Sequence, residues 1–192
     1  ATVQPEPFGT AAMDALDAEL RSVFQPGEYL SPDQVRGDAS SLNAAIRDHG
    51  WPSLDDARGK VVFLLDQRAA GLSYLPGHPS LRGRMCFTNA APGEDDAAFT
   101  ERNDGSAEDI AQLVKAGYLV RTRTDADLKE PARNDSTRRD SMLASGAQLL
   151  STDFPDHEPA SSGYVVRFDG DAAARCNPLF PKASCNGTDL AH

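Results

Sequence analysis

Charged side chains gather where two short apolar segments of the sequence end. Arg121 and Arg123 alternate with Val120 and Thr122, so on a strand both guanidinium groups point to one side. Two guanidinium groups on one side of a strand can hold a phosphate group in a bidentate manner. The alternative is a structural role, in which the two arginines form ion pairs with nearby aspartates.

Four aspartates follow the predicted strands and are the acidic half of the same candidate site. In α/β proteins, ligands bind at the carboxyl ends of parallel strands. A carboxylate at such a position can accept hydrogen bonds from the hydroxyl groups of a polyol, or it can orient an arginine. Helix capping and ion pairing are the alternative roles. The four residues are Asp66, Asp125, Asp127 and Asp153.

The histidines offer one further candidate for the site and no proton-transfer pair. His78 lies in Pro76-Gly-His-Pro79 and either lines a loop near the site or serves as a turn residue. His49 ends a predicted helix, where a positive charge is favoured by the helix dipole. His157 and His192 lie in polar segments and are expected to be solvated. We therefore assign no catalytic residue and no metal ligand within this chain.

Apolar runs that alternate with amphipathic segments must position these residues. The pattern indicates a parallel α/β architecture, and the run at 60–66 is typical of a strand buried on both faces. A small open sheet and part of a larger barrel both remain possible. We predict strands at 60–66, 84–89, 118–123 and 147–152, a short strand outside the main sheet at 164–168, and helices at 11–24, 41–49, 106–115 and from Ser136 or Thr137 to Ala144.

Composition limits the class of protein. The 192 residues fit a single domain, and the segment 156–192 reads as an irregular tail. A net charge of −10 excludes nucleic acid as a partner and argues against simple electrostatic adsorption to anionic membranes. No run approaches the roughly 20 apolar residues of a membrane span, and the N-terminus lacks the pattern of a signal peptide.

Three cysteines suggest an oxidising compartment. Cys176 and Cys185 lie in a Pro- and Asn-rich tail with little helix or strand pattern, where a disulfide would supply stability. Cys86 lies inside an apolar run and is expected to be a buried thiol. One predicted disulfide favours an exported, extracellular protein.

Short motifs in a fixed order resemble those of the bacterial calcium-dependent phosphoinositide-specific phospholipase C family, whose members are TIM-barrel phosphodiesterases. The resemblance extends from Met13 to Pro178. It is carried by Val35-Arg-Gly-Asp38, Gly50-Trp-Pro-Ser-Leu54, Gly59-Lys-Val-Val-Phe-Leu-Leu-Asp66, Gly77-His-Pro-Ser-Leu81, Arg121-Thr-Arg-Thr-Asp-Ala-Asp127 and Ser151-Thr-Asp-Phe-Pro155.

The resemblance implies a phosphoric diester hydrolase of lipid metabolism, secreted from the cell, that cleaves an inositol phospholipid with Ca²⁺. Two histidines would act as general base and general acid, and calcium with carboxylate ligands would stabilise the phosphate charge. In the family these groups lie on early strands, which would precede Ala1. The chain thus resembles the C-terminal half of an incomplete barrel, with about four parallel strands, and we expect it to be inactive alone.

Whether the chain is itself an enzyme stays open. The expected partners are a phosphoinositide or related phosphodiester head group, transient contact with a membrane surface, and a chain that supplies the missing half-barrel. One alternative is an enzyme similar to glycerophosphodiester phosphodiesterases, because the same charged cluster could serve a smaller head group. The other is a non-catalytic α/β module that binds a phosphate ligand or a partner chain.

Overall fold

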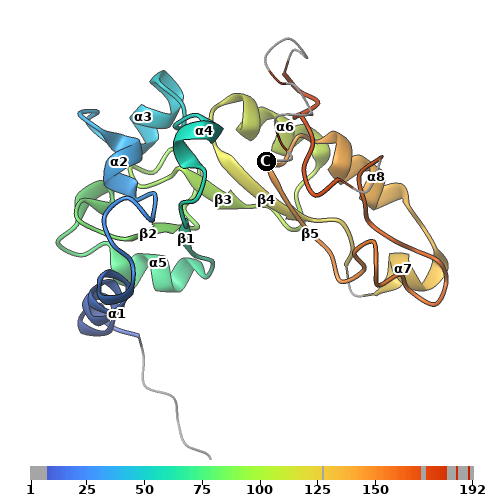
Figure 1. Ribbon diagram of the computed structural model, residues 1–192, viewed down its shortest axis with the longest axis horizontal. Helices are drawn as coiled ribbons and strands as arrows, with labels where there is room; N and C mark the ends of the chain where they lie inside the picture. The colour runs from blue at the N-terminus through green and yellow to red at the C-terminus, as the bar shows by residue number, and fades with distance from the viewer. Residues whose placement is uncertain (1–7, 127, 170–171, 181–184, 186–189, 191–192) are drawn as a thin grey trace, which may run out of the picture. The chain divides into compact units, whose positions relative to one another are not determined.

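The computed structural model describes residues 8–126, 128–169, 172–180, 185 and 190. It is an α/β protein whose strands lie in open sheets, with the pairs β1–β2 and β4–β5 parallel (Figure 1). These parallel pairs confirm the predicted parallel α/β architecture. Within the described residues the strands do not close into a barrel. The chain divides into two compact units, residues 1–100 and 101–192. The prediction of a single domain stays a prediction.

The first unit is mainly helical around one parallel strand pair. Strand β1 (Phe63–Leu65) pairs with β2 (Cys86–Thr88), with Leu64 opposite Phe87. The described helical segments of this unit are α1 (Thr10–Val23), α2 (Pro32–Arg36), α3 (Leu42–Asp48), α4 (Leu54–Ala57), α5 (Arg68–Tyr74) and the 3₁₀ turn η1 (Pro79–Leu81).

Serine caps begin three of these helices. The hydroxyl of Ser31 accepts a hydrogen bond from the Gln34 backbone N–H, and the Gln34 side chain accepts one from the Ser31 backbone N–H. This capping box satisfies two backbone donors that the first helical turn leaves free. Ser41 and Ser53 cap α3 and α4 through their hydroxyl groups. The predicted helix at 41–49 is therefore confirmed.

Strand β1 is shorter and more exposed than predicted. The run 60–66 contributes only Phe63–Leu65 to the strand, and all three residues are half-buried. Val61, which is 39% exposed, instead bridges Tyr29. The prediction of a strand buried on both faces is wrong, because every residue of β1 keeps part of its surface exposed. An apolar run does not by itself reveal how many elements cover it.

A buried polar cluster attaches α1 to the rest of the first unit, where α1 lies beside α5 (Figure 1). Asp17 accepts hydrogen bonds from the hydroxyl of Tyr74, from Arg84 Nη1 at 3.0 Å and from the Met85 backbone N–H at 3.1 Å. Arg84 is 2% exposed and lies 4.2 Å from the centre of the Tyr74 ring. Paired charges of this kind make α1 depend on one residue, Asp17.

Cys86 lies next to this cluster. It is a free cysteine and is buried, which confirms the predicted buried thiol. Burial raises the pKa of the Cys86 thiol to about 11, because the low-dielectric surroundings disfavour the thiolate.

The second unit contains the sheet that carries the candidate site. Strands β3 (Phe99–Glu101), β4 (Leu119–Arg123) and β5 (Leu149–Ser151) lie side by side in that order (Figure 1). Helix α6 (Ala107–Lys115), capped by Ser106, and helix α8 (Thr137–Ala144), with Ser136 at its N-cap, confirm predicted helices. Strand β3, helix α5 and the short helix α7 (Lys129–Arg133) are additional to the sequence prediction.

The chain after β5 is irregular, and the predicted strand at 164–168 is wrong. Only an isolated bridge between Pro155 and Val166 forms there. Alternation of apolar and polar residues was its only signal, and a single bridge supplies too few ladder hydrogen bonds for a strand. Tyr164 is nevertheless fully buried, and its hydroxyl donates to the Thr124 carbonyl oxygen at 3.2 Å.

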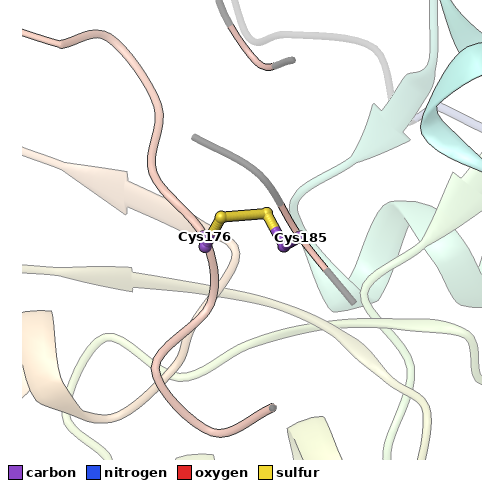
Figure 2. Close-up of a disulfide and its surroundings, with 2 residues drawn as sticks. All are labelled: Cys176 and Cys185. Atoms are coloured by element: carbon purple, nitrogen blue, oxygen red, sulfur yellow. A yellow bond between two sulfur atoms is a disulfide. The ribbon is translucent and has the colours of Figure 1, made fainter. Parts of the chain in front are cut away.

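A disulfide joins Cys176 to Cys185 in the tail (Figure 2). The Asn177 side-chain amide donates a 2.7 Å hydrogen bond to the Gly146 carbonyl oxygen, just after α8. Gly146 has a φ of +80°, and a Cβ atom there would lie 2.5 Å from Leu179 Cδ1. Glycine is therefore required at this position both for its backbone conformation and for the close approach of Leu179.

Candidate functional site

Strand β4 places the two predicted arginines on one side of the sheet. Thr122 between them is fully buried, whereas the side chains of Arg121 and Arg123 are 32% and 33% exposed. Arg121 lies opposite Leu149 and Arg123 opposite Ser151 in the parallel register with β5. Both guanidinium groups therefore reach the carboxyl ends of two neighbouring strands.

Each arginine has an acidic partner at or just after the end of β3. Arg121 forms an ion pair with Glu101 at the end of β3, and its Nη2 donates to Ser151 Oγ at 3.2 Å. Arg123 pairs with Asp104 at 2.7 Å, and Asp104 is 84% exposed. The pair of Arg121 is the better shielded from water, since only 14% of the Glu101 side chain is exposed.

Asp125 is held in place by donors from both strand ends. Its Oδ2 accepts a 2.6 Å hydrogen bond from Thr152 Oγ1 and lies 3.0 Å from Thr124 Oγ1, and its Oδ1 accepts from the Asp153 backbone N–H at 3.3 Å. The residue is 8% exposed. Burial of the Tyr164 hydroxyl, and second to it the nearby charge of this carboxylate, raise the pKa of Tyr164 to about 12. Asp125 therefore fixes the loops that follow β4 and β5.

These residues surround a polar cavity of about 430 Å³. Its wall offers guanidinium donors, hydroxyl groups that both donate and accept, an amide and carboxylate acceptors. Cavities of this volume are of the size that holds a small ligand. The described lining residues are Asn103, Arg121, Arg123, Asp125, Leu128, Ser151, Thr152 and Asp153.

Asp66 and His78 are not among the described residues that line this cavity. Asp66 follows β1 in the first unit and is exposed, and its backbone carbonyl oxygen accepts from the Asn89 side chain at 2.8 Å. His78 precedes η1 in the same unit, with Nδ1 2.7 Å from the Arg82 carbonyl oxygen, as in a turn. Asp127 lies outside the described residues.

The cavity also contains residues that the sequence analysis did not select. Ser151 and Thr152 end a predicted strand, so the strand-end rule that selected Asp153 could have found them. Glu101, which pairs with Arg121, ends β3, and Asn103 follows it. Because β3 is only three residues long and was not predicted, no pattern in the sequence placed these two residues beside Arg121.

The acidic residues at the cavity do not fit a calcium site. Calcium takes six to eight oxygen ligands, several of them from carboxylates. Asp125 already accepts hydrogen bonds from Thr152 and Asp153, and Glu101 pairs with Arg121. In the part of the chain that the structure describes, no three His, Cys, Asp or Glu side chains are grouped so that they could hold a metal ion.

Comparison with solved structures supports the fold. A Ca²⁺-dependent phosphatidylinositol-specific phospholipase C from Streptomyces antibioticus matches with a TM-score of 0.53 and 19% identity, over 76% of this chain and 58% of that chain. A calcium-dependent phosphoinositol-specific phospholipase C from a Pseudomonas species matches at 0.48 and 16%, over 66% and 53%. The chain thus spans less than two thirds of either enzyme. The likeness to the Streptomyces enzyme and the open parallel sheets confirm the predicted incomplete, barrel-like α/β fold.

Comparison of sequences gives the family. The profile of the family described as "Phosphoinositide phospholipase C, Ca2+-dependent" matches residues 1–178, nearly the whole chain. No curated protein is similar enough to count as a match. Because this match covers far more than half of the sequence, the chain belongs to the Ca²⁺-dependent phosphoinositide phospholipase C family.

Proposed function

We propose that this chain binds the polar head group of an inositol phospholipid for a phosphodiesterase of the phospholipase C type. The cavity at the carboxyl ends of β4 and β5 carries this proposal, because its wall mixes donors and acceptors in one polar surface. A ring with several hydroxyl groups requires such a mixture, since each hydroxyl group both donates and accepts.

The charges around the cavity favour a polyol ring with one phosphate over a phosphate alone. Arg121, Arg123, Asp125 and Asp153 all line the cavity, and Glu101 and Asp104 pair with the two arginines. A purely anionic ligand would lie beside the carboxylates of Asp125 and Asp153 as well as the two guanidinium groups. Arg123 is the proposed phosphate contact, since it lies at the carboxyl end of β4, opposite Ser151.

In this proposal, the phosphodiester bond is cleaved only when this chain is combined with the rest of the enzyme, and the cleavage depends on calcium. This chain alone is inactive. The placement of its described histidines supports this: His157 is 97% exposed, His49 ends α3, and His78 contacts a backbone carbonyl oxygen. A second chain or segment supplies the proton-transfer groups and the calcium ligands.

The proposal places the protein outside the cell, in lipid metabolism. The disulfide between Cys176 and Cys185 supports this placement, because such bonds persist in oxidising compartments. None of the described helices has the length and apolar character needed to cross a bilayer. Contact with the membrane is transient and occurs through the bound head group.

Two assays with the full chain test the proposal. Calorimetry should show binding of myo-inositol 1-phosphate, weaker binding of myo-inositol and little binding of glycerol 3-phosphate. Equal binding of glycerol 3-phosphate would instead favour a glycerophosphodiester substrate. Phosphatidylinositol vesicles incubated with the chain, in calcium or in chelator, should release no inositol phosphate. Calcium-dependent release would overturn the assignment of proton transfer to another chain.

A further inference from the structure

The second unit contains an apolar cavity among β5, the end of α8 and the irregular chain that follows β5. Its volume is about 320 Å³, and it shares part of its lining with a smaller cavity of about 180 Å³. A cavity of this volume with a mainly apolar lining is typical of a site for a small molecule. The larger apolar side chains that line it are Leu143, Leu150, Pro155, Val166 and Phe168.

The apolar side chains around this cavity keep part of their surface in contact with water. Four of them are half-buried: Leu143, Leu150, Val166 and Phe168. Met142, which precedes Leu143 on the same helix, is by contrast buried. An alkyl chain that filled the cavity would remove this remaining apolar surface from water, and each buried CH₂ group would add to the affinity.

The charged residues around the two cavities are mostly basic, although the whole protein has a net charge of −10. Arg167 and His157 line the larger cavity, and Arg175 lines the smaller one. Asp156 is the one carboxylate among the described residues that line either cavity. It pairs with Arg167 at 3.1 Å, yet 58% of the Arg167 side chain stays exposed. Arg175 lies 4.9 Å from the centre of the Phe168 ring, so a second cation lies beside the apolar lining.

We infer that this site binds the anion of a medium-chain fatty acid. The alkyl chain lies between Leu143 and Leu150, and the carboxylate lies at Arg167, whose guanidinium group can donate two parallel hydrogen bonds to it. The inference does not depend on the proposed head-group function, because the two cavities share only Thr152 with the polar cavity at the strand ends.

Calorimetry of the full chain with octanoate, decanoate and decylammonium, each below its micelle-forming concentration, tests the ligand class. Binding should tighten about tenfold from octanoate to decanoate, because two more CH₂ groups are buried. Decanoate should bind about fivefold tighter than decylammonium, although the net charge of −10 by itself favours the cation. Arg167→Gln should weaken decanoate binding about threefold and should not weaken the binding of decylammonium.

Ala173→Phe tests the location of the site. Ala173 is exposed and lines both cavities, so a larger side chain there should occupy the space of the alkyl chain and lower decanoate affinity about tenfold. Ala132→Phe is the matched control, because Ala132 is exposed on α7 in the same unit and lines neither cavity. Both variants should keep a thermal midpoint near that of the wild type, since both positions are exposed.

Three outcomes would overturn the inference: equal binding of decanoate and decylammonium, equal binding of octanoate and decanoate, or equal losses with Ala173→Phe and Ala132→Phe. The first two comparisons use the wild-type protein, so they test the inference even if a variant unfolds. Absence of decanoate binding would also overturn it, and would indicate a segment of another protein as the occupant of the cavity.

Discussion

The hydroxyl of Thr152 donates a 2.6 Å hydrogen bond to the buried carboxylate of Asp125. This bond joins the end of β5 to the end of β4, and both residues line the polar cavity. The Phe154 backbone N–H donates to the same hydroxyl at 3.0 Å. One side chain thus sets the path of the chain after β5 and the position of a carboxylate after β4.

Thr152→Val should therefore weaken both the fold and the cavity. It removes a donor to a buried carboxylate and keeps the side-chain shape, so the free energy of unfolding should fall by about 1–3 kcal/mol. Binding of myo-inositol should weaken in parallel. Urea unfolding and calorimetry measure the two effects. Thr152→Ser keeps the hydroxyl and should stay near wild type, and similar losses in both variants would argue against the hydrogen bond as the cause.

Glu101→Gln should change the selectivity of the cavity. Neutralising the partner of Arg121 removes an ion pair of about 1 kcal/mol and leaves the guanidinium charge available to a phosphate. Binding of myo-inositol 1-phosphate should improve about fivefold, while neutral myo-inositol should change little. Arg123→Gln should act in the opposite direction and lower phosphate binding about tenfold. Equal changes for both ligands would exclude the charge as the cause.

Asp17→Asn should be strongly destabilising. The change leaves the buried guanidinium of Arg84 without its buried counter-charge, which costs about 3–5 kcal/mol in the free energy of unfolding. Asp14 also pairs with Arg84 but is 58% exposed, so Asp14→Asn should cost less than about 1 kcal/mol. Urea unfolding of both variants measures the two losses in the free energy of unfolding. Equal losses would contradict a special role for the buried partner, Asp17.

The Cys86 thiol should make the protein less stable at alkaline pH. Burial raises the pKa of this thiol to about 11 in the folded state, from the ordinary value of 9.0 for a cysteine. Folding therefore favours the protonated thiol, and this contribution is complete below pH 9 and is lost as pH rises toward 11. The loss amounts to about 2–3 kcal/mol.

Unfolding in urea at pH 8, 9 and 10 measures this slope. Cys86→Ala should flatten it, although the variant is less stable at every pH because it loses packing. Tyr164 and Tyr74 also have raised pKa values, but their contributions begin to be lost only near pH 10, the ordinary pKa of a tyrosine, so the slope between pH 8 and 9 separates Cys86 from both. A slope that is the same with and without the thiol would rule out Cys86 as its source.

Reduction of the disulfide should destabilise the second unit. A bond that closes a loop over a separation of nine residues contributes about 2–3 kcal/mol on the chain-entropy account. Thermal unfolding with and without dithiothreitol measures this contribution. The double variant Cys176→Ser, Cys185→Ser should match the reduced protein and should not respond to the reductant.

The sequence predicted those parts of the structure that short-range chemistry determines. Ser41 and Ser106 mark the starts of their helices, because each capping hydroxyl accepts a hydrogen bond from the backbone N–H three residues later. Alternation along β4 was sufficient to place Arg121 and Arg123 on one side, and the strand-end rule brought Asp125 and Asp153 to the same cavity. Each of these predictions needs only neighbouring residues.

Contacts between residues that lie far apart in the sequence could not be predicted in this way. Strand β3 is three residues long and mixes Phe99 with Thr100 and Glu101, so no periodic pattern marks it. The partners of the arginines are Glu101, the last residue of that strand, and Asp104, just after it, and neither could be anticipated. The partial exposure of β1 likewise depends on which elements cover its faces, which its apolar residues do not encode.

The contact between Gly146 and Leu179 has a consequence for how the sequence can change over evolution. Any side chain at position 146 would collide with Leu179 and would also strain a backbone that has a φ of +80°. A smaller residue at 179 would relieve that collision, but the close approach of Asn177 Oδ1, at 2.9 Å from the same Cβ position, and the backbone strain would remain. No single change at 179 therefore releases position 146, and we expect glycine to persist at 146 while position 179 varies.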